Sequence, residues 1–295
     1  MRANTNRTGA LSFGLLATDY DVGRPRLSTE FLAKTAQRVG LPASGVGLEV
    51  GAGTGQLTGA LLDAGWTVHA LEPCPPMADR LFERYRDEVA ARQLVVLDDA
   101  FETFRGASPG SFDAIWSADA WHWIDPLLAY HRSAELLKPG GRLVAIWTLA
   151  GLVEDRAVAG QLNEIYEELS PDLVRDPEAP VDESVLAAGR HEIDASHAMV
   201  VSDYWIEDEP RSIDRSTYVA WQLSYGHIVQ MAAADRGRLS GAITNVLRHW
   251  TDGRQIPVRL WRYIVASQRV VDQGRSPNTN WIPPITDESS GQPTE

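Results

Sequence analysis

Three glycines behind an acid form the densest chemical pattern of the chain, in the stretch "LEVGAGTGQ" at residues 48–56. Gly51, Gly53 and Gly55 alternate shortly after Glu49. Glycine-rich turns between a strand and a helix are typical of nucleotide sites, because their bare backbone N–H groups receive negative charge. Here the third glycine lies one residue earlier than in the dinucleotide fingerprint G-x-G-x-x-G. Glu49 beside the turn disfavours a pyrophosphate and favours a ligand that carries positive charge.

Two more acids follow predicted strands further along the chain. Glu72 lies about twenty residues after the first glycine, where α/β nucleotide sites place the carboxylate that accepts from ribose hydroxyls. Asp99 follows the next strand, where an acid can accept from an adenine amino group. The ends of these strands should line one crevice. S-adenosylmethionine fits such a crevice, because it carries a sulfonium, an ammonium and an adenosine but no phosphate.

Strands and helices must alternate to bring these residues together. Apolar runs predict strands at 46–50, 66–73, 93–100, 111–120 and 142–149, with helices at 56–64, 75–90 and 126–141 between them. This alternation predicts a parallel sheet with helices on both faces. Beyond residue 149 we expect helices at 154–169, 213–231 and 235–250, and strands at 197–208 and 256–270. The acidic run at 206–210 is interpreted as a solvated loop.

The chain is expected to form one domain with appended ends. We predict an N-terminal arm at 1–17, a cofactor-binding core at 18–150, and lid helices with a closing strand pair at 151–270. The polar tail at 271–295 is predicted to be disordered. Residues 9–17 are apolar like a signal-peptide core but lack a good cleavage site, so a short docking helix or mobile segment is favoured.

The composition of the chain limits which partners, ligands and cellular locations we expect. The chain has 295 residues, of which 44% are hydrophobic, and a formal net charge of -13. Without a Lys/Arg cluster, such an acidic chain is not expected to bind nucleic acid. The single cysteine, Cys74, cannot form an intrachain disulfide and fits the cytoplasm. No apolar run approaches the roughly 20 residues of a membrane span. No residue spacing resembles a metal site, and the oligomeric state stays open between monomer and homodimer.

Longer motifs carry a family resemblance. The segments "LEVGAGTG", "HALEP", "DDAFE", "FDAIWSADAWHWID" and "LLKPGGRLVAIW" resemble a class I S-adenosylmethionine-dependent methyltransferase. "YDVGRPRLS" at 20–28 and "AWHWID" at 120–125 resemble the subgroup that includes trans-aconitate methyltransferases and many small-molecule methyltransferases. The resemblance covers about residues 18–270. It implies a Rossmann-like, doubly wound seven-stranded sheet with an antiparallel last strand and a helical lid after the fifth strand.

The resemblance also implies which residues bind S-adenosylmethionine. The turn on the methionine side would hold it with Glu49, Gly51, Ala52, Gly53, Gly55 and Gln56. Glu72 and Pro73 would take the ribose, Met77 the adenosine, and Asp99, Ala100 and Phe101 the adenine, with Ser117 on the fourth strand. Tyr20 and Arg24 would close over the methionine carboxylate; there, Val22 and Gly23 replace a more usual polar pair.

The acceptor side is less defined. Methyl transfer needs an in-line approach and the exclusion of water, and a base only if the acceptor must lose a proton. His122, just past the fourth strand, is the candidate base because imidazole titrates near neutrality. Alternatively it caps a turn or packs between its tryptophan neighbours. An aromatic acceptor pocket, or alternatively ordinary core packing, is predicted for Trp121, Trp147, Trp221 and Tyr225.

These residues favour a cytoplasmic methyltransferase acting on a small molecule, with oxygen as the expected acceptor atom and carbon or nitrogen as alternatives. A second hypothesis is a protein that binds S-adenosylmethionine and binds or rearranges a substrate without methylating it. A third is a protein methyltransferase, which would show an open groove instead of a closed cavity.

Overall fold

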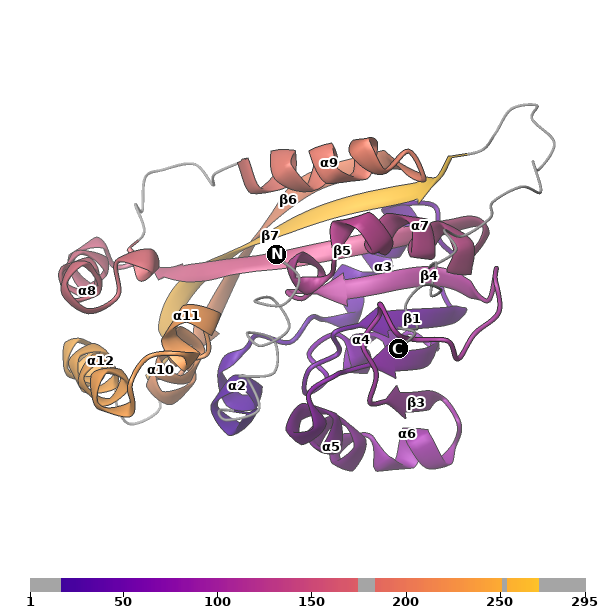
Figure 1. The fold of residues 1–295 in the computed structure, drawn as a ribbon. Helices are drawn as coiled ribbons and strands as arrows, with labels where there is room; N and C mark the ends of the chain where they lie inside the picture. Colours follow the sequence, from indigo (N-terminus) through magenta and orange to yellow (C-terminus); the bar gives the residue numbers. More distant parts are fainter. Residues whose placement is uncertain (1–16, 175–183, 251–253, 271–295) are drawn as a thin grey trace, which may run out of the picture.

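A single mixed sheet organises the chain, as Figure 1 shows. The computed structural model describes residues 17–174, 184–250 and 254–270. The predicted arm at 1–17, except its last residue, and the predicted tail therefore lie outside the described residues. The strand order is β3-β2-β1-β4-β5-β7-β6. The strands are β1 (Val46–Val50), β2 (Thr67–Leu71), β3 (Leu94–Leu97), β4 (Phe112–Ala118), β5 (Leu137–Val153), β6 (Met199–Ile213) and β7 (Ile256–Arg269).

The pairing confirms the predicted fold class. The first five strands pair in parallel, and β7 runs antiparallel to both of its neighbours, β5 and β6. Helices cover both faces, as expected when right-handed crossovers join parallel strands. They are α3 (Thr29–Arg38), α4 (Thr58–Asp63), α5 (Pro75–Arg84), α6 (Arg86–Ala90), α7 (Pro126–Leu136) and α9 (Ser184–Ser196).

Two predicted helices are divided in the structure. The helix expected at 75–90 breaks at Tyr85, which leaves helical geometry between α5 and α6. The helix expected at 213–231 begins only after Asp214, whose side chain accepts from the Thr217 N–H as an N-cap. It then stops at Ser224, so that α10 (Arg215–Leu223) and α11 (Gly226–Val229) are separate.

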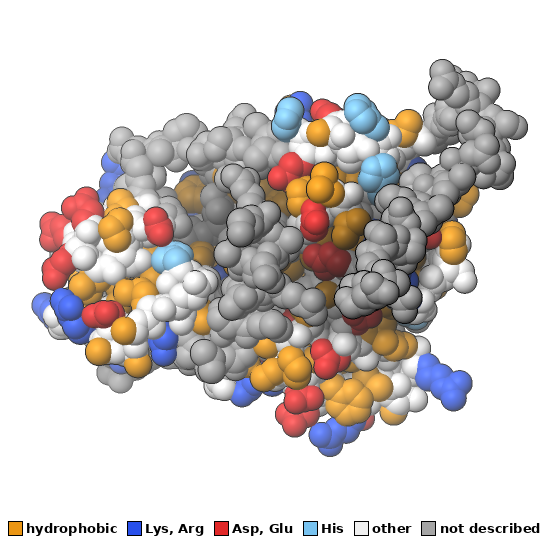
Figure 2. Space-filling view, viewed as in Figure 1, with side chains coloured by type: hydrophobic (Ala, Val, Ile, Leu, Met, Phe, Trp, Pro, Cys, Tyr) orange, Lys and Arg blue, Asp and Glu red, His pale blue; other side chains and the backbone are white. Residues whose placement is uncertain are grey.

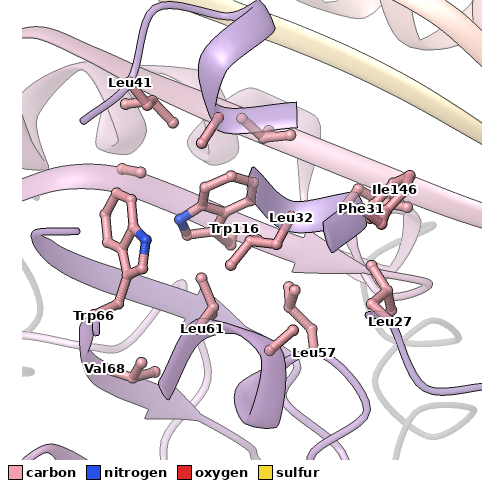
Figure 3. Close-up of a cluster of buried hydrophobic side chains, with 14 of the residues drawn as sticks. Leu27, Phe31, Leu32, Leu41, Leu57, Leu61, Trp66, Val68, Trp116 and Ile146 are labelled. Carbon is pink, nitrogen blue, oxygen red and sulfur yellow. The ribbon is translucent and has the colours of Figure 1, made fainter. Parts of the chain in front are cut away.

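Two hydrophobic clusters hold the helices to the sheet. On one face, α3 and α4 bury Phe31, Leu32 and Leu61 against the strands (Figure 3). Trp66 and Trp116 meet there edge to face, with ring centroids 5.8 Å apart. On the other face, a second cluster is formed by α7, α9 and the loop after β4. Burial on both faces explains why the central strands are continuous apolar runs.

The last three strands extend beyond the core and carry the helices that the sequence predicts as a lid, called the lid segment below. Their far ends pack under α8 (Arg156–Leu169), α10, α11 and α12 (Ala233–Val246), which share a third hydrophobic cluster (Figure 1). β5 passes through residue 150 without interruption, so the core and lid segments share the sheet. Exposed acids gather on α8, where Glu168 pairs with Arg238 of α12 at 3.6 Å (Figure 2).

The acidic run at 206–210 is part of β6, so its interpretation as a loop was wrong. Arginines on the partner strand explain the difference, because they neutralise the run. Arg259 pairs with Asp208 at 3.3 Å, and the fully buried Arg262 pairs with Glu209 at 2.9 Å. None of the helices in the described ranges is long and apolar enough to cross a membrane.

A short N-terminal helix, α2 (Ala17–Gly23), joins the lid to the core. Gly23 lies against the backbone of α10, where a Cβ would stand 2.3 Å from the Trp221 nitrogen. No side chain fits this contact without moving one helix. The glycine therefore sets the distance between α2 and α10.

We expect Gly23→Ala to lower the free energy of unfolding by about 1–3 kcal/mol, because the added methyl overpacks the helix contact. Gly160→Ala is the matched control, since Gly160 lies on α8 with nothing within 4 Å of an added Cβ. That control should be neutral or stabilise by up to about 1 kcal/mol through helix propensity. Urea denaturation measures both; equal midpoints for the two variants would contradict the contact.

Candidate functional site

A narrow pocket lies at the edge of the sheet where β1 and β4 end. Its empty volume is about 320 Å³, including solvent at its mouth. Parallel strands place their carboxyl ends at one edge, and ligands of such sheets bind there. The lining comes from the segment around α2, the glycine turn and the end of β4: Tyr20, Arg24, Pro25, Leu27, Glu49, Gly51, Ala52, Gln56, Leu57, Ala118 and Asp119.

Glycine occupies the three positions of the turn for different structural reasons. Gly51 has φ +70°, and a Cβ there would stand 2.3 Å from the Ala120 Cβ in the loop after β4. Gly55 has φ +95° and makes room for the Tyr85 ring, 2.6 Å from an added Cβ. Gly53, with φ +59°, would meet only Gln56, Met77 and Tyr20 at ordinary distances. Residues other than glycine rarely adopt these backbone angles.

Two buried carboxyl groups lie behind the turn. Glu72 accepts from the Gly53 N–H at 2.7 Å and from the Cys74 N–H at 2.9 Å. Burial raises the pKa of Glu72 to about 7, against the lowering effect of those two bonds. Glu49 accepts from the Thr58 hydroxyl at 2.7 Å, and burial raises its pKa to about 8. A ligand that donates hydrogen bonds or carries positive charge would favour their ionised forms.

The predicted adenine side is assembled around the ends of β2 and β3. Met77 is buried with Cys74 and Ala17, and Pro73 is half-buried between β2 and α5. Asp99 accepts from the Thr103 hydroxyl, and Ala100 next to it is half-buried. Phe101 is buried in the cluster on the α7 face.

The buried hydroxyl of Ser117 donates to the Val50 carbonyl at 2.9 Å and so ties β4 to β1. Gln56 donates to the Thr54 hydroxyl at 2.8 Å within the turn. As cofactor contacts, both residues stay predictions.

Hydrogen bonds and ion pairs hold the segment around the helix α2 beside the pocket. Asp21 accepts from the Thr54 hydroxyl at 2.9 Å and pairs with Arg26 at 3.0 Å and with Arg84. Arg24 is buried; its Nε donates to Ser224 Oγ at 2.9 Å and its Nη2 to the Ser224 carbonyl at 3.2 Å. Burial raises the pKa of Tyr20 to about 12. The predicted pair Tyr20 and Arg24 thus both reach the pocket wall.

The Trp-His-Trp loop forms a short 3-10 helix, η2 (Trp121–Trp123). Trp121 is buried against Phe101 and Tyr130, with ring centroids 5.6 and 6.0 Å away. His122 is exposed, and its Nδ1 accepts from the Trp147 indole N–H at 3.3 Å. Desolvation by the surrounding protein lowers the pKa of His122. An Nδ1 that accepts a hydrogen bond carries no proton, so the ring is neutral in this arrangement.

The other two predicted aromatics belong to the lid. Trp221 is fully buried in the lid cluster. Tyr225 stacks on His227, and the Arg24 guanidinium lies over its ring at 4.7 Å. Trp121 and Trp221 thus lie in hydrophobic clusters, whereas Trp147 and Tyr225 are half-buried. Acceptor contacts for all four stay predictions.

Asp119 is the site residue that the sequence analysis missed. It follows β4 directly, lines the pocket, and has φ +55°. One carboxylate oxygen accepts from the Thr148 N–H at 2.6 Å, and the other lies 4.0 Å from Arg24 Nη1. An Asp right after a buried strand was the available signal, because Asp tolerates this backbone region better than most residues. Within the described residues, no group of His, Cys, Asp and Glu could hold a metal ion.

We expect the ligand-free protein to lose stability as the pH rises from 5.5 to 8.5. The folded state keeps a proton on Glu49 up to about pH 8, whereas the unfolded chain releases it near pH 4.5. The contribution is complete below pH 4.5 and is lost as the pH passes 8, which amounts to about 2–3 kcal/mol over this range.

Urea denaturation at several pH values measures this slope. Glu49→Gln should reduce the slope and nearly abolish it above about pH 7, because the raised pKa of Glu72 still contributes below that pH. Glu30→Gln, at an exposed pair with Lys34, should keep the wild-type slope. Equal slopes in all three proteins would contradict a protonated Glu49.

The sequence of this chain is similar to those of known methyltransferases. Residues 48–145 match the family described as a methyltransferase domain. An uncharacterized methyltransferase of Mycobacterium tuberculosis is 37% identical over 150 residues, 48% of this chain and 54% of that protein. The chain thus spans about half the length of the first curated relatives it matches. An uncharacterized methyltransferase of Geobacillus kaustophilus is 30% identical over 176 residues, 56% of this chain and 76% of that protein.

A ubiquinone biosynthesis O-methyltransferase of Xanthomonas campestris is 35% identical over 148 residues, 48% of this chain and 61% of that protein. Among solved structures, a methyltransferase fold from Anaeromyxobacter dehalogenans aligns with a TM-score of 0.56 at 18% identity. That alignment covers 83% of this chain and 97% of the other. At this identity the likeness shows a shared fold.

Proposed function

This chain belongs to the class I S-adenosylmethionine-dependent methyltransferases, and on that basis we propose that it methylates a small molecule, with an oxygen as the acceptor atom. The observation that carries the proposal is the narrow pocket at the sheet edge in which the glycine turn, Glu49, Arg24 and Asp119 meet. When bound there, S-adenosylmethionine supplies an electrophilic methyl group on a sulfonium.

The chain's own groups suit this cofactor. Arg24 is the only Lys or Arg side chain among the described residues that line the pocket, so a pyrophosphate would lack counter-charge. Glu72 and the segment 99–101 would hold the adenosine, and the turn from Gly51 to Gln56 the methionine part. Burial raises the pKa values of Glu49 and Glu72, and hydroxyl or ammonium donors of a bound ligand would favour their ionised, accepting forms.

Two observations favour a small acceptor, and a third favours oxygen as its acceptor atom. The pocket is narrow, and its wall is tied to the lid segment through Arg24 and Ser224, which would help to keep water from the reacting atoms. The half-buried rings of Trp147 and Tyr225 offer flat surfaces to an aromatic or apolar acceptor. The oxygen acceptor is supported by the Xanthomonas relative, whose name states O-methylation.

His122 is the proposed acceptor-side catalytic residue, and its hydrogen bond bears on its role. An indole N–H can only donate, so the lone pair of His122 Nδ1 is occupied by Trp147. The neutral ring then carries its proton on Nε2. In this arrangement the ring can donate from Nε2 to an acceptor oxygen that is already ionised, such as a carboxylate, and Nδ1 has no free lone pair with which to take a proton from a hydroxyl. The base role stays the alternative.

We also propose membership of the subgroup that includes trans-aconitate methyltransferases. The segment 20–28 carries the resemblance, and its Tyr20 and Arg24 line the pocket, which supports the proposal. The cytoplasm is the proposed location, because the chain has a single cysteine.

Purified protein should bind both S-adenosylmethionine and S-adenosylhomocysteine in a calorimetric titration. Glu72→Gln should weaken both by about 1–3 kcal/mol, the cost of losing one acceptor oxygen of a charged group. Glu30→Gln should leave both affinities unchanged. Absence of binding to the wild-type protein would overturn the proposed cofactor. Failure to release S-adenosylhomocysteine with hydroxyl or carboxyl acceptors, but release with amines, would move the acceptor atom to nitrogen.

Once an acceptor that the protein methylates is known, substitutions of His122 can distinguish a hydrogen-bond donor from a general base. Gln can donate where Nε2 does but cannot act as a base, so His122→Gln should keep most of kcat while His122→Ala loses about 10- to 100-fold, the scale of a removed donor. Equal loss in both variants, with a rate that rises through the imidazole pKa, would instead establish the base. Wild-type turnover in both variants would exclude His122 from catalysis.

A further inference from the structure

Asp119 holds an unusual conformation in the wall of the pocket. Three non-glycine residues in the described part of the chain have positive φ, namely Arg92, Asp119 and His197, and of these Asp119 lines the pocket. Its Oδ1 accepts from the Thr148 N–H at 2.6 Å, which fixes the carboxylate to β5. Backbone strain of this kind persists where the surroundings enforce it and often marks functional positions.

The second carboxylate oxygen of Asp119, Oδ2, can accept further hydrogen bonds. Among the described residues, no hydrogen bond reaches Oδ2, and its nearest cation is Arg24 Nη1 at 4.0 Å. That distance supports an ion pair but is too long for a hydrogen bond. The side chain is 22% exposed, so the oxygen is open to the pocket.

Arg24 faces Asp119 with its remaining nitrogen. Nε and Nη2 are both fixed on Ser224 of the lid, and the rings of Tyr20 and Tyr225 lie against the guanidinium. Within the described ranges, Nη1 makes no hydrogen bond. The pocket wall therefore carries one cation and one anion side by side, each held from behind and each with a free hydrogen-bonding position.

A buried chain of polar groups supports the carboxylate. Arg262, fully buried on β7, donates from Nη1 to the Thr148 hydroxyl at 2.9 Å. Thr148 in turn donates its N–H to Asp119. The other acid in the lining, Glu49, keeps its proton to about pH 8 because burial raises its pKa. Asp119 is thus the acid of the lining whose carboxylate these hydrogen bonds fix in place.

An α-amino acid presents an ammonium and a carboxylate on one carbon. A guanidinium recognises the carboxylate and a carboxylate recognises the ammonium, each through charge-assisted hydrogen bonds. The family resemblance already implies Arg24 for the methionine carboxylate, and we propose that Asp119 is its counterpart, with Oδ2 accepting from the α-ammonium of the same amino-acid end. This inference rests on the proposed function, because it takes the pocket as the cofactor site.

Two ligands that differ in one group test the pair. S-adenosylhomocysteine carries the α-ammonium, and its deamino analogue, with hydrogen in place of that group, does not. Asp119→Asn should weaken S-adenosylhomocysteine about 10- to 100-fold in calorimetry, the range of a hydrogen bond to a charged group. The same variant should bind the deamino analogue within about twofold of wild type, since that ligand has nothing for Asp119 to accept from.

The variant is conservative. Asn keeps an oxygen for the Thr148 N–H and tolerates positive φ, and a urea midpoint close to wild type checks its fold. Asp203→Asn is the charge-matched control; Asp203 pairs with Arg38 away from the pocket, and both ligands should bind this variant as they bind wild type.

Each other outcome decides against the pair or its premise. Unchanged S-adenosylhomocysteine binding in Asp119→Asn overturns the role of Asp119 and leaves the proposed function intact. Equal weakening of both ligands also overturns it, because a general change of pocket shape would do that. If wild type binds neither ligand, the proposed function fails and the pair fails with it.

Discussion

The site depends on the contact between Gly51 and Ala120. A Cβ at Gly51 would lie 2.3 Å from the Ala120 Cβ, so the turn after β1 and the loop after β4 touch with no side chain between them. The parallel register that pairs Glu49 with Trp116 brings the two segments to the same sheet edge. The glycine turn belongs to the first segment, and Asp119 and the Trp-His-Trp loop to the second. A wider separation would divide the cofactor side from the acceptor side.

Burial and hydrogen bonding oppose each other at the acids behind this contact. Glu72 accepts two backbone N–H bonds, which favour the carboxylate, yet burial raises its pKa to about 7. Glu49 has one hydroxyl partner, and burial raises its pKa further, to about 8. Without ligand, these groups are short of the charge and donors that would stabilise their ionised forms. A cationic, hydroxyl-bearing ligand would supply both, which explains why a polar pocket of this kind suits a phosphate-free nucleoside.

The lid reaches the same pocket through shared strands and one short helix. β5, β6 and β7 run from the core into the lid cluster, so the lid is an extension of the sheet and not a separate body. Gly23 seats α2 against α10, and Ser224 at the end of α10 holds two nitrogens of Arg24. A side chain of the pocket is thereby positioned by a residue 200 positions away in the chain. Movement of the lid would move Arg24.

The sequence by itself determined the alternation of strands and helices, the sheet and the class of ligand, because strand periodicity, the glycine spacing and the acids after strands are local patterns. The bounds of the long strands were not determined: β5 begins at Leu137, inside the helix predicted at 126–141, and β6 continues to Ile213, beyond the predicted end at 208. Local patterns failed where partners came from distant segments. The acidic run at 206–210 became a strand because arginines of β7 neutralise it. The helix expected at 75–90 divides at Tyr85, whose ring packs beside Gly55. Asp119 is held in the pocket wall by contacts with Thr148 and Arg24, which are distant in the sequence. The Nδ1 of His122 likewise accepts from Trp147, a residue of β5. Which side chains meet in the pocket was decided by tertiary packing, since no spacing along the chain encodes contacts between β4, β5 and α2.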